Sequence, residues 1–407
     1  MIILNEAAEA SDRLERNNVN KKEKTKMNTK EIGEIKRRVR RDRSNMQAVY
    51  GCYVGADKKI ISDFKTGIGT MPENEAEKYF SLFKKTLSGT LGKTLHDIIF
   101  STKQVAEREK HHHLLMEARR TALTDDAIRN ELFQNIVDAI DIECNYLILL
   151  GCDTYDVPFK TKDDVEQEDC SEESFTYILC AICPVKETAP NLHYVHDEKA
   201  FHDGGMIHAV NKPSLGFMFP AFDNRATNIY GALLYGKDTS KNHQELVDAV
   251  FGTRVPEAAD EQKASFDAIL RASMGDECNM DLVQSLHEQA VTNTQMHKEA
   301  KTPDILTVDR NDIEKLLSAA GASDDKVNDF GDAFEEAFGM NASVPLGNII
   351  DVKHYTVKTP DVTIKVAPDR ACDVEVRKIG GATYICIAAD GGVEVNGIPL
   401  AFDSTCG

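Results

Sequence analysis

Two apolar runs in the middle of the chain, NYLILLGC at residues 145–152 and FTYILCAICPV at residues 175–185, decide the fold. Both are short and rich in aliphatic, β-branched and aromatic residues, which is typical of strands buried on both faces. Similar runs follow at residues 192–195, 215–219 and 228–235. Helical crossovers between these runs are too scarce for a doubly wound parallel sheet. We therefore expect an α+β protein with a mixed or antiparallel central sheet and flanking helices.

The segments around this sheet differ in pattern and predict several parts. Residues 309–320 and 323–338 carry apolar side chains at helical spacing, whereas the C-terminal segment alternates apolar and polar residues as strands do. The expected parts are a disordered tail or non-native extension (1–26), an N-terminal α/β module with a basic helix (27–143), a central β-rich domain (144–255), a helical region (256–345) and a small C-terminal β-module (346–407).

Length and composition exclude several classes of protein. The chain has 407 residues, of which 42% are apolar, and no apolar stretch is long enough for a transmembrane helix or a signal peptide. We therefore expect a cytoplasmic protein, with its ten scattered cysteines reduced. The net charge of −19 repels bulk nucleic acid, so any nucleic-acid contact must be local.

The front of the chain is basic although the whole is acidic. Residues 1–45 contribute +5, and the other 362 residues carry −24. A helix is predicted at 29–42, where Asn28 and Glu31 form a capping box and Ile32, Ile35 and Val39 make one apolar stripe. Five cations point away from that stripe or flank it, and we expect them to bind a polyanion. They are Lys36, Arg37, Arg40, Arg41 and Arg43.

A second candidate site consists of polar residues that follow two predicted strands. Asp153 and Asp156 end the run that begins at residue 145, and Asp223, Arg225 and Asn228 follow the run at 215–219. If the sheet brings these loops together, they form a polar pocket for a small ligand. Alternatively, the aspartates and the asparagine bond their own turns and Arg225 pairs with Asp223.

Metal and redox motifs are weak. His193, His196 and His202 lie close in sequence and are the only metal candidates, although His193 and His196 diverge on a strand. Cys180 and Cys183 form a CxxC, but an odd spacing on a strand places their side chains on opposite faces of the sheet. We therefore interpret them as buried thiols of the core and not as a redox pair. The triplet at 111–113, three histidines on a predicted helix, is interpreted as a solvated face. No cofactor is expected.

Three functions remain open from the residues alone. The first is a non-enzymatic binding protein that contacts RNA, the ribosome or another polyanion through the basic helix, with no reading of DNA sequence and no membrane contact. The second is an enzyme or small-ligand sensor with the polar pocket. The third is an interaction scaffold whose acidic segment 163–173 binds a basic partner. The sequence names no protein partner.

Six stretches carry a resemblance to a known family: MNTKEIGEIKRRVRRDRSN (27–45), GCYV (51–54), KKTLSGTLGK (84–93), NYLILLGCDTYDVP (145–158), FPAFDNRATNIY (219–230) and TPDVTIKVAP (359–368). Together they resemble a bacterial family described as domain of unknown function 4317. The resemblance covers nearly the whole chain after residue 26, which favours Met27 as the native start. It implies a soluble protein of Gram-positive, largely anaerobic bacteria, and it implies no activity.

Overall fold

The structure is a computed structural model that describes residues 26–160, 166–188, 192–203, 205–340, 342–389, 392–395 and 397–400. The chain forms two compact units. The first unit extends to Asp260 and includes Pro303–Ile305, and the second contains the remaining residues up to the C-terminus. Each unit is described by itself below.

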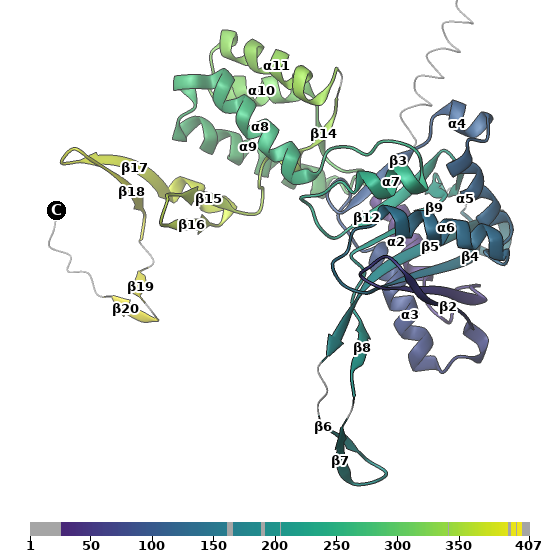
Figure 1. Cartoon of the computed structure of the whole chain (residues 1–407). Coiled ribbons are helices and arrows are strands. Elements are labelled where there is room, and N and C mark those ends of the chain that lie inside the picture. The colour runs from purple at the N-terminus through teal and green to yellow at the C-terminus, as the bar shows by residue number, and fades with distance from the viewer. Residues whose placement is uncertain are drawn as a thin grey trace, which may run out of the picture. The chain divides into compact units, whose positions relative to one another are not determined.

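The first unit is built on one antiparallel sheet of eight strands (Figure 1). The strand order is β2-β1-β4-β5-β9-β12-β3, and β8 pairs with β5 outside this path. The strands are β1 (Ala48–Val54), β2 (Ile60–Gly67), β3 (Leu95–Ile99), β4 (Tyr146–Lys160), β5 (Glu166–Thr188), β8 (Ile207–Val210), β9 (Leu215–Phe219) and β12 (Gly231–Gly236). The predicted α+β class and central sheet are confirmed, and every strand pair of this sheet is antiparallel.

Helices cover both faces of this sheet, which explains why the two decisive runs carry apolar residues on both faces. Side chains of β4 alternate between two cores: Ile148 and Leu150 belong to one, and Leu147 and Leu149 belong to the other. On the first face lie α4 (Thr102–Ala106), α5 (Lys110–Arg120), α6 (Asp126–Ala139) and α7 (Gln244–Val250), and on the second lie α2 (Thr29–Arg38) and α3 (Glu73–Thr86).

The boundary expected near residue 143 does not separate two domains in the structure. β1, from the expected N-terminal module, pairs with β4, and β3 pairs with β12. These long-range pairs place residues 27–143 and 144–255 in a single sheet, because strands far apart in sequence are neighbours in it. The sequence patterns located the strands but not their partners.

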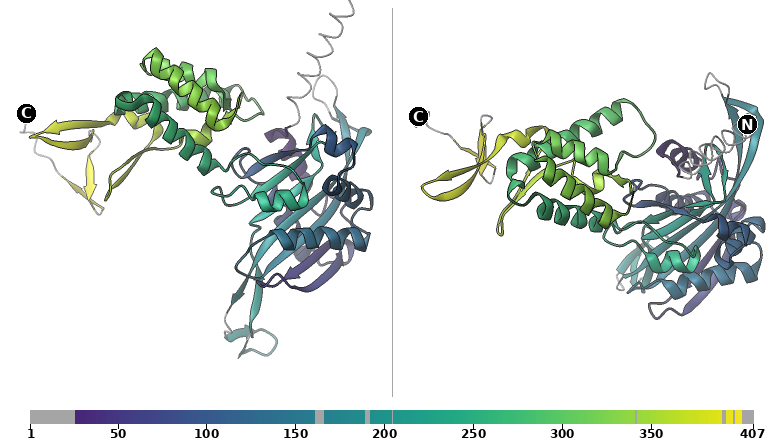
Figure 2. Two further views of the ribbon diagram at one scale, coloured as in Figure 1. Left: turned by 45° about the horizontal axis from the view of Figure 1, so that its top comes forward. Right: turned by 90° about the horizontal axis from the view of Figure 1, so that it is seen from above.

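Strands β4 and β5 extend beyond their neighbours, as Figure 2 also shows. β1 pairs with β4 only up to Gly151, and β9 pairs with β5 only from Ile178 onward. The rest of the β4–β5 pair is a two-stranded extension. Two further hairpins belong to this unit: β6 (Leu192–Val195) with β7 (Ala200–Asp203), and β10 (Ala221–Asp223) with β11 (Ala226–Asn228).

The second unit is helical and then β-rich. Its apolar core joins α8 (Ala259–Met274), α9 (Met280–Glu299), α10 (Arg310–Ala319) and α11 (Asp324–Phe338), so the predicted helix pair is present. β13 (Thr307–Val308) pairs with β14 (Val344–Pro345), and α12 (Leu346–Ile349) follows. The described residues after α12 form three hairpins: β15–β16 (Tyr355–Lys358 and Thr363–Val366), β17–β18 (Val374–Ile379 and Ala382–Ile387) and β19–β20 (Val393–Val395 and Ile398–Leu400).

In the part of the chain that the structure describes, no helix has both the length and the apolar character that a membrane crossing requires.

Candidate polyanion interface and cavity

Helix α2 begins where the sequence predicts. The side chain of Asn28 accepts hydrogen bonds from the backbone N–H groups of Lys30 and Glu31, and Glu31 accepts one from the N–H of Asn28. This reciprocal capping box fixes the first turn. The helix ends at Arg38, earlier than the predicted residue 42. The following segment 39–45, called the basic turn below, folds back so that the N–H groups of Arg43 and Ser44 donate to the carbonyl of Arg40.

The two acids of α2 face the body of the protein. Glu31 is 7% exposed, and its Oε1 accepts a 2.7 Å hydrogen bond from the backbone N–H of Asn224. Glu34 Oε1 accepts hydrogen bonds from Arg225 Nη1 at 2.6 Å and from the Tyr155 hydroxyl at 2.7 Å. From the sequence alone, both acids are expected to offset part of the positive charge of the helix. The structure instead uses them internally, so neither lies on the outer side of α2.

One cation of the segment is used for structure. Arg38 donates from Nη2 to the carbonyl of Arg43 at 2.7 Å, and its guanidinium carbon lies 4.3 Å from the centroid of the Tyr155 ring. Cation–π packing and a backbone hydrogen bond both order this side chain. Arg38 therefore holds the basic turn in shape, and it was not among the five residues predicted to bind a polyanion.

Those five residues are all on or near the surface. Arg37, Arg40 and Arg43 are exposed, and Lys36 and Arg41 are half-buried. Arg40 Nε lies 3.1 Å from Asp42 Oδ1, but both side chains are more than half exposed and such a pair is weak. Within the described residues, no ion pair involves Lys36, Arg37 or Arg41. The basic turn thus presents more cations than acids to solvent.

The predicted ligand pocket is not assembled, because two of its residues leave β4 in opposite directions. Asp153 is buried and accepts hydrogen bonds from the N–H groups of Asn45 (2.6 Å) and Thr154 (2.9 Å) and from the Tyr177 hydroxyl (2.7 Å). Asp156 is exposed. An odd spacing of three residues on a strand separates the two carboxylates, so they do not face one cleft.

The other three pocket candidates lie on the β10–β11 hairpin. Asn228 Nδ2 lies 3.5 Å from Asp223 Oδ2, at the limit of a hydrogen bond. Arg225 pairs with Glu34 of α2 and donates from Nη2 to the carbonyl of Pro158 at 2.8 Å. The expected pairing of Arg225 with Asp223 is replaced by this longer-range contact. Arg225 of this hairpin therefore anchors α2.

The three metal candidates lie on or beside the β6–β7 hairpin, where His193 and His202 are register partners. His196 is exposed, and His202 Nε2 lies 2.8 Å from Glu198 Oε2. His193 belongs to β6, and its side chain lies outside the described residues. In the described residues, no three histidine, cysteine or acidic side chains come together as metal ligands would. The acidic segment 163–173, which was expected to bind a basic partner, lies largely outside the described residues. Residues 163–165 are not described at all, and the side chains of residues 166–173 are not described either.

The CxxC behaves as the spacing predicts. Cys180 belongs to the core under α5–α7, and Cys183 belongs to the core under α2 and α3. Both are fully buried, and burial raises the pKa of the Cys183 thiol to about 12. These thiols are core residues.

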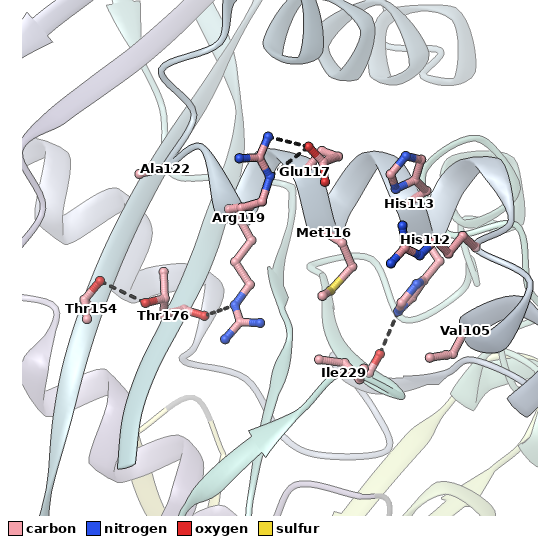
Figure 3. A pocket seen from close by; sticks show the side chains of 12 residues that line it. Val105, His112, His113, Met116, Glu117, Arg119, Ala122, Thr154, Thr176 and Ile229 are labelled. Atoms are coloured by element: carbon pink, nitrogen blue, oxygen red, sulfur yellow. Dashed lines mark hydrogen bonds and ion pairs between the residues drawn. The ribbon is translucent and has the colours of Figure 1, made fainter.

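A cavity of about 760 Å3 lies between α5 and the β4–β5 extension (Figure 3). His112, Met116 and Arg119 recur at helical spacing and extend from one face of α5 towards the strands. Thr154 and Thr176, which are register partners with hydroxyl oxygens 3.1 Å apart, line the strand side. The other lining residues are Val105, Arg108, His113, Glu117, Arg120, Ala122 and Ile229.

His112 corrects the interpretation of the three histidines as a solvated face. It is 3% exposed, and its Nε2 lies 3.0 Å from the carbonyl oxygen of Ile229. A carbonyl only accepts, so Nε2 carries the proton, and burial lowers the pKa of the ring below its ordinary value. The signal was present in the sequence, because His112 precedes the buried Leu115 by one helical turn.

The first unit therefore has an α+β fold in which helices cover both faces of an antiparallel sheet, with a cationic turn beside α2 and a cavity under α5. A family model described as a domain of unknown function, DUF4317, matches residues 27–398. The chain belongs to this family. No curated protein matches it.

Proposed function

We propose that this is a non-enzymatic, cytoplasmic bacterial protein that binds structured RNA, on the ribosome or free, through Lys36, Arg37, Arg40, Arg41 and Arg43. The inward orientation of Glu31 and Glu34 carries the proposal. Because both acids are satisfied by the protein itself, the outer side of α2 and the basic turn presents mainly cations, with Asp42 as an exposed acid among them. Phosphate groups are the polyanionic ligands that such a surface fits.

The chemistry of the basic turn favours reading of the backbone. Residues 36–43 contain no aromatic side chain, and aromatics make up only 7% of the chain. This surface therefore has few side chains that could stack on bases, and we expect contacts to phosphate groups to dominate. We expect binding that depends steeply on salt and weakly on sequence. The net charge of −19 restricts the contact to this surface.

The test is RNA binding by the full chain, measured by fluorescence anisotropy with a labelled RNA hairpin at several salt concentrations. The variant combines Arg37→Glu, Arg40→Glu and Arg41→Glu, and we expect it to abolish binding. A control combines Lys298→Glu, Lys315→Glu and Lys353→Glu, three exposed residues of the second unit, so the net charge changes equally. The proposal is wrong if the control loses binding as fully as the variant, or if neither does.

The alternative function, an enzyme or small-ligand sensor built from the 153–156 and 219–228 loops, lacks the shared pocket that it needs. Asp153 is enclosed by hydrogen bonds from Asn45, Thr154 and Tyr177, and Arg225 is paired with Glu34. These contacts stabilise the fold and do not converge on a ligand.

A further inference from the structure

A second cationic surface lies at one end of the central sheet. The net charge of −19 keeps RNA away from the body of the molecule as a whole, but it leaves room for a further local surface of opposite sign. Three segments, 84–94, 211–214 and 236–238, together contain five lysines and one acid. We call these lysines the lysine edge, and they are Lys84, Lys85, Lys93, Lys212 and Lys237.

Strand pairing brings the three segments together. In the antiparallel order β9-β12-β3, the starts of β9 and β3 and the end of β12 lie at the same end of the sheet. The backbone N–H of Gly236 donates to the carbonyl of Thr94 at 3.0 Å, and the N–H of Lys237 donates to the carbonyl of Ser214 at 2.8 Å. Because neighbouring strands lie about 4.8 Å apart, the lysines that flank these strand ends are close neighbours on one surface.

The end of α3 belongs to the same surface. Lys84 and Lys85 lie in the last turn of this helix, and Lys85 Nζ lies 6.0 Å from the centroid of the Tyr235 ring on β12. The negative end of the helix dipole favours these two cations. The other three lysines flank strands, so no helix end accounts for their presence.

Acids of the described residues do not neutralise the lysine edge. None of its five lysines forms an ion pair with a described residue, and the three outside α3 are exposed. Two acids lie nearby and have other partners: Asp238 accepts hydrogen bonds from the N–H of Ser240 at 3.1 Å and from its hydroxyl at 2.7 Å, and Asp260 accepts one from the Thr239 hydroxyl at 3.3 Å. Five lysines beside two acids leave a net positive charge.

The acids of β5 whose side chains are not described lie away from this surface. They belong to residues 166–173, in the two-stranded extension at the start of β5. The start of β9, beside the lysine edge, instead pairs with Ile182 near the other end of β5. The extension therefore does not supply counter-charges to the lysine edge.

The chemistry of the lysine edge suits phosphate groups. Ser88, Thr90 and Ser214 add hydroxyl groups to the lysines, and both kinds of side chain commonly contact phosphate oxygens in nucleic-acid complexes. No large apolar side chain is exposed in segments 84–94, 211–214 and 236–238. The surface therefore has no side chain that would insert into a bilayer, and this favours RNA over a membrane as its partner.

We propose that the lysine edge contacts the phosphate backbone of the same RNA that the basic turn binds, so that one RNA occupies both surfaces. This inference rests on the proposed function. Helices α2 and α3 pack on the same face of the sheet. Thr154, beside the basic turn, pairs with Thr176 of β5, and Leu215, beside the lysine edge, pairs with Ile182.

The two surfaces are close enough for one RNA. Residues 176 and 182 are six residues apart on β5, which corresponds to about 20 Å along the strand. An RNA duplex of about 16 base pairs, the length that one double-stranded RNA-binding domain covers, is long enough to reach both surfaces. Two contacts made by one RNA strengthen binding beyond either contact alone.

The experiment measures fluorescence anisotropy of the full chain with two labelled RNAs, a duplex of about 16 base pairs and a stem of about four base pairs. We expect the parent chain to bind the long duplex at least about tenfold more tightly than the short stem. The variant replaces three exposed lysines, and it combines Lys93→Gln, Lys212→Gln and Lys237→Gln. It should lose this gain with length. The slope of log Kd against log salt concentration should also fall by about 2–3 for the long duplex, because each phosphate contact contributes about 0.9.

The control makes the same change of charge at three exposed lysines of the second unit, and it should bind both RNAs as the parent chain does. It combines Lys298→Gln, Lys315→Gln and Lys353→Gln.

The inference and the proposed function fail in different ways. If the lysine-edge variant keeps both the gain with length and the salt slope while the basic-turn variant (R37E, R40E and R41E) loses binding, the inference is wrong and the proposed function stands. If the basic-turn variant binds both RNAs as the parent chain does, the proposed function is wrong and the shared RNA is excluded with it. Binding to phosphatidylserine vesicles that the lysine-edge variant loses, with RNA binding unchanged, would assign the surface to lipid headgroups and overturn the inference.

Discussion

Glu34 of α2 and Arg225 of the β10–β11 turn form a 2.6 Å hydrogen-bonded ion pair across 191 residues of sequence. The backbone of Arg225 adopts a φ of 61°, in the left-handed region that residues other than glycine and asparagine seldom occupy. The pair therefore balances local backbone strain with a long-range contact. It also turns the acid of α2 inward and fixes the helix that carries the basic surface.

Removing one partner of this pair should destabilise the first unit. Arg225→Gln leaves Glu34 half-buried with only the Tyr155 hydroxyl as a donor, so we expect a loss of about 1–3 kcal/mol in the free energy of unfolding. The side chains are 24% and 17% exposed, which keeps the loss below that of a fully buried pair. Urea unfolding of Arg225→Gln, Glu34→Gln and the double variant measures the coupling. A double variant as unstable as the sum of the singles would show that the pair contributes nothing.

The carboxylate of Asp153 should matter more than any one of its donors. Asp153→Ala leaves the Tyr177 hydroxyl and the N–H of Asn45 without their acceptor inside the protein, and we expect a loss of about 2–4 kcal/mol. Tyr177→Phe removes a single donor and serves as the matched control, with an expected loss of about 1 kcal/mol. Thermal unfolding would contradict this ranking if the two variants were equally stable.

Asp153 also anchors the basic turn, because its carboxylate accepts a hydrogen bond from the N–H of Asn45, the last residue of the turn. If Asp153→Ala folds, its RNA affinity should fall although no cation of the turn has changed. Tyr177→Phe leaves the hydrogen bond between Asp153 and Asn45 in place, so its RNA affinity should remain near that of the parent chain.

Strand periodicity predicts which side chains of β4 and β5 share a face. The spacing of three residues correctly separated Cys180 from Cys183 onto two faces. The same spacing separates Asp153 from Asp156, so strand geometry alone argues against a pocket shared by both carboxylates. The contact between Glu34 and Arg225 has no local signature, because it forms only when α2 packs against the β10–β11 hairpin.

The end of α2 shows a different limit of sequence interpretation. The capping box at Asn28 is local and was predicted correctly, since it involves residues three apart. At the end of the helix, the side chain of Arg38 contacts the Tyr155 ring, which is a tertiary contact, and the carbonyl of Arg43 five residues later. The apolar stripe continued to Val39 and gave no signal of this end.

The reactivity of each cysteine towards alkylating reagents should depend on whether its thiol is buried. Cys144 and Cys372 are exposed, whereas Cys180 and Cys183 are fully buried and burial holds their thiols protonated. We expect iodoacetamide to modify Cys144 and Cys372 in the folded protein, and Cys180 and Cys183 only in urea. Mass spectrometry of the digested protein measures each site. Alkylation of Cys180 at the rate of Cys144 under native conditions would contradict the burial of this strand.

The carboxyl group of Asp97 should make stability depend on pH in the opposite sense to an ordinary ion pair. Burial raises the pKa of Asp97 to about 6, and the nearby acids Asp223 and Glu31 act in the same direction. The backbone N–H of Met27 donates to its Oδ1 at 3.1 Å, and that bond together with the charge of Lys26 lowers the pKa only in part.

The folded state therefore holds this proton more tightly than the unfolded chain, where the ordinary pKa of 3.8 applies. The contribution of Asp97 to stability is then largest below about pH 4 and falls as the pH rises to about 6. Asp97→Asn stays neutral at every pH and retains an oxygen that accepts from Met27. We expect it to stabilise the protein at pH 7.5 by up to about 3 kcal/mol, with no gain at pH 4.

Urea unfolding of Asp97→Asn and the parent chain at both pH values measures this difference. The control is Asp57→Asn at an exposed turn, where Lys59 lowers the pKa of the carboxyl group instead of raising it. That variant should show no gain at pH 7.5, because its carboxylate is already favoured in the folded state. A gain from Asp97→Asn that is as large at pH 4 as at pH 7.5 would mean that packing, and not the buried charge, is the cause.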